Sequence, residues 1–276
     1  MGGALSLAAL RAALWLWYRG THFRGWQRQA TPGTVQQAVE EKLRAYGVTG
    51  GLAAAGRTDG GVHARQQVCS LRVPSGTDFE ALQAQLAGVD WGCAAAAASP
   101  KGFHAQWTPS LKEYRYRLAF DAVPSSWAEY TWDVHSEARL GGRAATADVL
   151  AAALGEATGT RDFSAFHAAS SVRRLRTLQA VHVHTERGGF MEVRFCGTGF
   201  GRYQVRALVG GAALVAAGQL DARTWRAALQ DAVPFPGLLA PPHGLVLWAV
   251  DYQGRGPCGE AAPRGLPTGP PFVGFG

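Results

Sequence analysis

Short segments with the spacing of strands and helices follow one another along this chain in two similar sets, and this order constrains the fold more than any other feature. Residues 13–18 are an apolar run with three aromatic side chains, which predicts a buried strand. Residues 34–46 predict a helix, because Thr34 and Gln37 have the spacing of a capping box before an amphipathic run. A strand over 68–73, a helix over 78–87 and a strand over 114–118 complete the first set.

The second set has a helix, a hairpin, two helices and a strand, over residues 144–154, 178–196, 202–217, 221–230 and 245–252. Two α+β halves that share a mixed sheet suit this order better than an alternating parallel fold. We place the boundary near residues 119–126, so that residues 1–120 form an N-terminal half and residues 121–253 a C-terminal half. Residues 254–276 hold seven Gly and five Pro and predict a flexible tail.

The charge balance is basic, with 27 Lys and Arg against 20 Asp and Glu and a net charge of +7. Residues 160–210 alone hold eight arginines against three acids. Arginine suits bidentate contact with phosphate, so a polyanionic partner is favoured. A solvated surface in which Arg replaces Lys for reasons of base composition is the alternative, and charge by itself does not separate the two.

The cysteines and histidines predict no metal centre. The four cysteines form no Cys-x-x-Cys pair, so we expect neither a zinc site nor a disulfide framework, which fits a reducing compartment. His182 and His184 share a strand face but have no third ligand in sight. No apolar run reaches the roughly 18 residues of a membrane helix. The apolar, acid-free start of the chain leaves a cytoplasmic and an organellar location open.

The first segment with candidate chemistry is Arg57-Thr58-Asp59-Gly60-Gly61. A turn is the simpler interpretation, because Asp-Gly is a common turn dipeptide. The alternative is a reactive carboxylate on a loop, where the arginine precedes Asp59 by two residues and small neighbours let a ligand approach closely.

Two further segments combine aromatic or glycine residues with arginine. In residues 112–116, the two tyrosines either pack on the core face of a strand or form a platform for an unstacked base. Residues 197–206 are a glycine-rich turn that opens a helix, with Arg202 and Arg206 on one face. A buried Arg206 would need an acidic partner, and Asp59 is a candidate.

Together these segments resemble the tRNA pseudouridine synthases of the TruA family. Any one motif would be a weak match, whereas six that occur in the family's order along most of the chain are a specific signal. They lie in residues 18–29, 56–64, 103–105 with 114–116, 162–166, 199–210 and 241–252.

The resemblance implies a site and a fold. By position, Asp59 is the catalytic aspartate, Tyr114 the aromatic residue that stacks on the target uracil, and Arg206 the partner of the carboxylate. Arg57 is expected to engage the RNA backbone as the base swings out, and further RNA contacts are expected from Arg24, Arg28 and Arg202. The implied fold has two similar α/β-sandwich halves. They share a central mixed, mainly antiparallel sheet, with helices packed on one face and an active-site cleft for RNA between the halves.

The resemblance also implies an isomerase that acts on tRNA, in the anticodon stem-loop, as a homodimer without cofactor or metal. The reaction breaks the N1–C1′ bond, rotates the uracil and rejoins it through C5, so nothing is oxidised and nothing leaves. Asp59 either attacks C1′ or takes the 2′ proton, and the sequence leaves both routes open. Two alternatives are an RNA-binding protein of this fold with lost or altered activity, for example on organellar RNA, and a glycosidase-like hydrolase. The hydrolase is disfavoured, because no second carboxylate flanks Asp59.

The chain departs from the family pattern at several positions. The Asn-x-x-Leu-Pro segment expected before Phe103 is not recognisable in residues 89–100. The substituted positions, with the usual residue in brackets, are Arg19 (Asp), Gly60 (Ala), Gln106 (Arg), Gly201 (Leu) and Gln204 (Met). We therefore expect catalysis to be preserved and substrate choice to be open to drift.

Overall fold

The computed structural model describes residues 9–48, 50–121, 123, 125–140, 146–169, 175–185, 189–252 and 272. Contacts along the chain divide it into two compact units, residues 1–110 with 249–267 and residues 111–248 with 268–276. The strand at 111–119 falls in the second unit because it pairs there along its length. The half boundary predicted at residue 120 stays a prediction, and the predicted tail lies outside the described residues except for Phe272.

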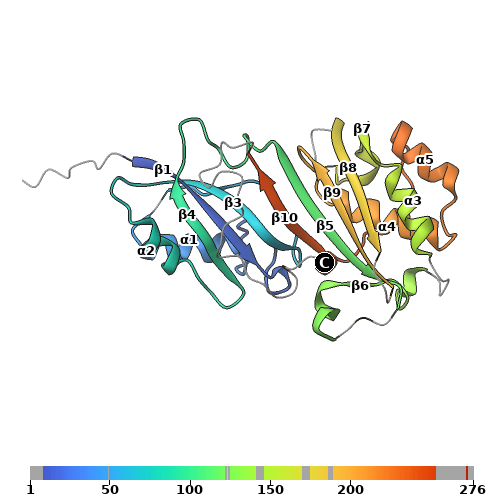
Figure 1. The fold of residues 1–276 in the computed structure, drawn as a ribbon, viewed down its shortest axis with the longest axis horizontal. Coiled ribbons are helices and arrows are strands. Elements are labelled where there is room, and N and C mark those ends of the chain that lie inside the picture. The colour runs from blue at the N-terminus through green and yellow to red at the C-terminus, as the bar shows by residue number, and fades with distance from the viewer. Residues whose placement is uncertain are drawn as a thin grey trace, which may run out of the picture. The chain divides into compact units, whose positions relative to one another are not determined.

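The first unit is built on an antiparallel sheet in which β1 (Ala9–Tyr18) lies between β3 (His63–Pro74) and β4 (Trp91–Ala98) (Figure 1). A short strand, β2 (Ala53–Ala54), adds to β3. The middle of β1 is buried on both faces, as its continuous apolar run predicts. Strand β4 was not predicted, because its five consecutive alanines have little strand propensity. The segment is a strand because it pairs with β1.

Two helices accompany this sheet. Helix α1 (Val35–Ala45) begins where the Thr34 side chain accepts a hydrogen bond from the backbone N–H of Gln37 at 3.3 Å, as the capping box predicts. Gly47 follows its last turn with a φ of +88°, a conformation that favours glycine. Helix α2 (Phe79–Gln85) begins at Asp78, whose side chain accepts from the backbone of the first turn. A 3₁₀ turn (Gly20–His22) follows β1.

The second unit has strands β5 (Leu111–Ala119), β9 (Phe190–Gly197), β8 (Leu175–Thr185) and β7 (Gly159–Asp162), each antiparallel to the next (Figure 1). On the other side of β5 lies β10 (Leu245–Asp251), of which residues 245–248 belong to this unit. The short β6 (Trp132–Asp133) pairs with β5 in parallel. The predicted hairpin over 178–196 is thus the β8–β9 pair, although its turn lies partly outside the described residues.

The described part of the second unit has three α-helices: α3 (Ala147–Gly155), α4 (Gln204–Ala216) and α5 (Ala222–Asp231). Helix α4 is buried along most of its length and contacts both of the others. It begins at Gln204 rather than at residue 202, because Tyr203 adopts a left-handed φ of 70° that a helix cannot continue. Among the described residues of this unit, 3₁₀ turns lie at Ser125–Tyr130, Ala138–Leu140, Ser164–Phe166 and Pro242–Gly244.

The protein is therefore an α+β protein with mixed, mostly antiparallel sheet, which confirms the predicted fold class at this level. Among the residues that the structure describes, no helix combines the length and apolarity needed to cross a bilayer.

Candidate active-site loops

Asp59 lies on the loop between β2 and β3 in the first unit. Burial changes from residue to residue along this loop: Arg57 is exposed, Thr58 is buried and Asp59 is half-buried. The half-buried Asp59 therefore lies on a loop whose neighbouring residue is anchored in the core. This placement suits a group that must meet a substrate from a fixed position.

Thr58 is held by the end of strand β1. The Tyr18 hydroxyl lies 2.8 Å from Oγ1 of Thr58, and the buried side chain of Gln67 donates to the Tyr18 hydroxyl oxygen at 3.3 Å. The β1–β3 register shifts between Leu16 and Tyr18, at the same end of the strand. Such irregularities re-aim a side chain, and here the re-aimed residue is the one that contacts the Asp59 loop.

Gln67 also holds the beginning of the loop. Its Nε2 donates to the carbonyl oxygen of Gly56 at 2.7 Å, and its Oε1 accepts from the Gly56 N–H at 3.4 Å. One residue earlier, the backbone of Ala55 donates to Val68 at 2.7 Å. The buried Gln67 amide thus takes the place of the next backbone hydrogen bonds of the β2–β3 pair, and it fixes where the loop leaves β3.

The other side of the loop packs against residues 20–26. Trp26 donates its backbone N–H to the carbonyl oxygen of Thr58 at 3.0 Å, and Gly61 donates to Gly20 at 3.1 Å. The backbone of Gly20 also donates to Nδ1 of the buried His63 at 3.0 Å. Since this nitrogen accepts a hydrogen bond, it carries no proton and the neutral ring holds its proton on Nε2.

Two glycines make this close approach feasible. A Cβ added to Gly20 would collide with the carbonyl group of Val62. Gly25 has a φ of +93°, and its Cβ would lie 2.8 Å from the carbonyl oxygen of Thr58. The glycines of the opening motif are therefore explained by the backbone that passes them.

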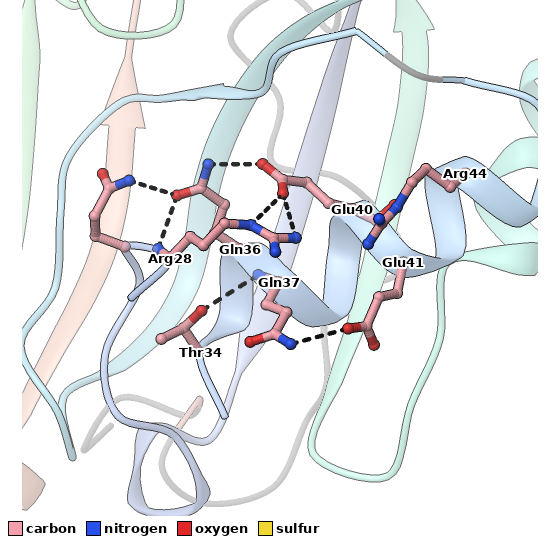
Figure 2. Close-up of polar contacts among 8 residues, drawn as sticks. Arg28, Thr34, Gln36, Gln37, Glu40, Glu41 and Arg44 are labelled. Atoms are coloured by element: carbon pink, nitrogen blue, oxygen red, sulfur yellow. Dashed lines mark hydrogen bonds and ion pairs between the residues drawn. The ribbon is translucent and has the colours of Figure 1, made fainter. Parts of the chain in front are cut away.

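The predicted RNA-binding arginines of this unit differ in their surroundings. Arg57 and Arg24 are exposed, and the backbone of Arg24 lies beside the loop, 3.5 Å from where a Cβ of Gly60 would be. Arg28 is also at the surface, but its guanidinium is held by Glu40 of α1, with Nη2 2.6 Å from Oε2 (Figure 2).

In the second unit, Tyr114 lies on β5 with its ring centroid 4.9 Å from that of Phe200, in an edge-to-face arrangement. Its side chain is largely buried. Tyr116, two residues on, is fully buried and donates its hydroxyl to the carbonyl oxygen of Pro241 at 2.8 Å. Both tyrosines are therefore core residues, and Tyr114 differs in that its ring contacts Phe200 of the glycine-rich turn.

Arg206 lies in the first turn of α4 and is buried. Its Nε donates to the carbonyl oxygen of Ala240 at 2.7 Å, and the Ala240 N–H donates back to the Arg206 carbonyl at 3.2 Å. The guanidinium carbons of Arg206 and Arg202 lie 5.6 Å and 4.6 Å from the ring centroid of Tyr203. Arg202 itself is exposed. The left-handed Tyr203 therefore brings an aromatic ring close to both arginines.

Two departures from the family pattern fit together at this turn. The side-chain oxygen of Gln204 accepts a hydrogen bond from the backbone N–H of Gly201 at 2.7 Å, which ties the first residue of α4 to the turn before it. A Cβ at Gly201 would lie 2.7 Å from the Cβ of His167, so a larger residue would need this contact to change. The two substitutions are compatible with an ordered turn.

Sequence reasoning missed several groups near the predicted site. Tyr18, Gln67 and His63 were not singled out for this role, because their contacts with the loop link residues far apart in sequence. Lys112, on the same face of β5 as Tyr114, has its pKa lowered to about 8 by burial and by the nearby charge of Arg176. Its position two residues before the predicted aromatic platform was the available signal.

No group of three or more His, Cys, Asp or Glu side chains able to hold a metal ion is found among the described residues. His182 and His184 are exposed on β8, where they lie opposite Arg194 and Glu192 of β9.

Comparison with known proteins defines the class. A family model described as tRNA pseudouridine synthase matches residues 153–253. A tRNA pseudouridine synthase A of Thermosynechococcus vestitus is 34% identical, over 95% of this chain and 94% of the relative. Those of Methylobacterium nodulans and Solidesulfovibrio magneticus are each 36% identical, over 85% and 90% of this chain and 93% of each relative.

The chain is thus a pseudouridine synthase, an isomerase. It belongs to the tRNA pseudouridine synthase A family, the TruA family that its motifs predicted.

Proposed function

We propose that this protein isomerises uridine to pseudouridine in the anticodon stem-loop of tRNA, with Asp59 as the catalytic carboxylate. The substrate class follows from the names of its relatives. The observation that carries the role of Asp59 is the construction of its loop, in which Thr58 is hydrogen-bonded to Tyr18 and Trp26 while the neighbouring Asp59 is half-buried. In the proposed fold, two similar α/β-sandwich halves flank an active-site cleft and bring the two candidate loops together.

The reaction requires an ionised carboxylate in a pocket that excludes water around the base. Burial in such a pocket raises the pKa of a carboxyl group, and a guanidinium beside it opposes that rise. We assign this role to Arg206, because its Nε bond to Ala240 fixes the side chain and the planar group has further N–H donors. Asp59 then attacks C1′ or takes the 2′ proton, and both routes need the same charged state.

The target uridine must leave its stack before the carboxylate can reach its sugar. Tyr114 is proposed to stack on the extruded uracil, which offsets part of the lost stacking energy. Arg57 precedes Asp59 by two residues and is proposed to contact the backbone around the extruded nucleotide. Arg24 and Arg202, both exposed, are proposed to bind flanking phosphates.

The experiment is tritium release from tRNA that carries 5-tritiated uridine, since the bond to C5 displaces that hydrogen. Asp59→Asn should abolish release while tRNA binding stays within about threefold of wild type. Asp148→Asn, an exposed position on α3, is the matched control and should keep full activity. Full turnover by Asp59→Asn would refute the role of the carboxylate.

The same assay separates the alternatives. A protein that binds tRNA but never releases tritium would be an RNA-binding member of the family without activity. Free uracil among the products would indicate hydrolysis instead of isomerisation. The homodimer also remains a proposal, which light scattering of the purified protein tests directly.

A further inference from the structure

Arg28 and Glu40 form an ion pair on the surface of the first unit (Figure 2). Nε and Nη2 of Arg28 lie 2.8 Å and 2.6 Å from the same carboxylate oxygen, Oε2. The Glu40 side chain is 21% exposed and that of Arg28 is 41% exposed. The forked donors of Arg28 are therefore directed to a carboxylate within the protein.

The second oxygen of Glu40 extends the pair into a network. Gln36, one turn earlier on α1, donates its Nε2 to Oε1 of Glu40 at 2.7 Å. The side-chain oxygen of Gln36 accepts from Nε2 of Gln27 at 2.9 Å and from the backbone N–H of Arg28 at 3.0 Å. Figure 2 shows these contacts joining α1 to the segment that precedes it. The helix thus holds residues 27 and 28 by their side chains and their backbone.

The held segment is the one that supports the Asp59 loop. Trp26 accepts a backbone hydrogen bond from Gln36 at 3.0 Å and donates its own N–H to Thr58 at 3.0 Å. Gly25 accepts from Val35 at 3.1 Å and packs against Thr58. A continuous set of contacts therefore runs from Glu40 through residues 25–28 to the residue next to Asp59.

We infer that Arg28 and Glu40 are positioning residues for the catalytic loop, and that Arg28 acts through this network rather than as a phosphate ligand. This inference rests on the proposed role of Asp59, and it replaces the RNA contact predicted for Arg28 from the sequence. A phosphate would have to displace a carboxylate that already occupies two N–H donors of Arg28. The ion pair instead ties α1 to the segment that sets the position of Thr58.

The inference predicts a distinctive pattern of kinetic effects. Glu40→Gln removes the charge but keeps the shape of the side chain, and Arg28→Gln removes the other partner. Each should lower the single-turnover rate at saturating tRNA about fivefold, because a weakened tether leaves the loop less often in its productive position. The Kd for tRNA and its dependence on salt should stay at their wild-type values. The double variant should be no slower than either single variant, because both changes break one contact.

Two comparisons make the test specific. Glu41→Gln is the matched control, since Glu41 is the next residue of the same helix and accepts only a surface contact from Gln37 in Figure 2. Its rate should equal that of wild type. Arg28→Lys keeps the charge but loses the fork, so it should be as slow as Arg28→Gln. Urea unfolding of each variant shows that the proteins assayed are folded.

The experiment distinguishes failure of the positioning role from failure of the proposed catalytic role of Asp59. If Arg28→Gln raises the Kd and reduces the salt slope by roughly one, while Glu40→Gln keeps the wild-type rate, Arg28 is a phosphate contact and the inference is wrong. Wild-type rates for Glu40→Gln would also overturn it. Asp59→Asn is assayed in parallel, because its inactivity beside an active Glu40→Gln would refute only the positioning role.

Discussion

The hydroxyl oxygen of Tyr18 lies 2.8 Å from Oγ1 of Thr58, and this contact joins the end of β1 to the loop that carries Asp59. Both residues are buried, as is Gln67, which donates to the same hydroxyl. Because Tyr18 accepts from Gln67, its own proton is available for Thr58. The hydroxyl therefore connects two buried polar groups that would otherwise each lose a hydrogen-bonding partner.

Tyr18→Phe removes this hydroxyl without changing the ring. We expect the free energy of unfolding to fall by about 1–3 kcal/mol, because the Thr58 hydroxyl and the Gln67 amide each lose a buried contact. The isomerisation rate should fall as well, since Thr58 precedes Asp59. Urea unfolding and single-turnover assays measure the two effects. Tyr46→Phe is the control, because the Tyr46 hydroxyl donates to the backbone oxygen of Asp78 at 3.2 Å in an exposed contact. It should lower the free energy of unfolding by less than about 0.5 kcal/mol. Equal effects for the two variants would contradict the argument.

The glycines around Asp59 should respond to alanine in opposite directions. A Cβ at Gly60 would come no closer than 3.5 Å to Arg24, an ordinary contact, so Gly60→Ala should raise the free energy of unfolding by about 0.4–1 kcal/mol. Gly25→Ala should lower it by more than that, because φ is +93° and Thr58 lies 2.8 Å away. Thermal unfolding of both variants checks this, and a stabilised Gly25→Ala would show that the loop can move aside.

The sequence predicted those elements whose signals are local. The helix predicted over 34–46 is observed at Val35–Ala45. It could be predicted because the residues that cap it and those that form its apolar face all lie within this short segment. Strand β4 was missed, because its alanines are held by a partner strand far away in sequence. For the same reason the motifs identified the Asp59 loop, but not the contacts from Tyr18 and Gln67 that fix it.

Arg115 and Arg117 show the same limit on β5. Their alternation with the tyrosines predicts a strand correctly, but such alternation would normally leave the arginines in solvent. Both are buried, because Glu192 on the neighbouring strand β9 lies 2.9 Å from Arg115 and 3.1 Å from Arg117. The guanidinium of Arg115 also stacks 3.6 Å above the ring of Trp248. The ion pairs with Glu192 on a neighbouring strand allow the two arginines to be buried, and the local sequence pattern does not predict these pairs.

Glu192→Gln should therefore destabilise the second unit strongly. Glu192 is almost completely buried. Removing its charge leaves the buried guanidinium groups of Arg115 and Arg117 without the negative charge that offsets their desolvation. Burial already lowers the pKa of Arg117 to about 10, against the opposing effect of Glu192. We expect a loss of about 3–5 kcal/mol in the free energy of unfolding, measured by urea denaturation. Glu113→Gln, which affects a more exposed contact with Arg115, should cost far less. A loss below about 1 kcal/mol for Glu192→Gln would show that the arginines relax to solvent.

Lys112 should make stability depend on pH in the alkaline range. Its pKa in the folded protein is about 8, lowered from 10.5 by burial and by Arg176. Between these two pH values the unfolded chain binds a proton that the folded protein has released, so this group makes the folded state more stable as pH rises. Below pH 8 both states are protonated and the full cost of the buried charge is present.

Lys112→Met removes this contribution. The variant should be more stable than wild type at pH 7, and the difference should shrink as pH rises from 8 toward 10. Comparing the two proteins at each pH matters, because burial raises the pKa of Cys69 and raises that of Cys93 to about 12. Those thiols stay protonated longer in the folded state and make it less stable as pH rises, equally in both proteins. Urea denaturation at pH 7, 8, 9 and 10 measures the difference, with Lys101→Met as the exposed control. A difference that stays constant across this range would show that Lys112 keeps its proton in the folded protein.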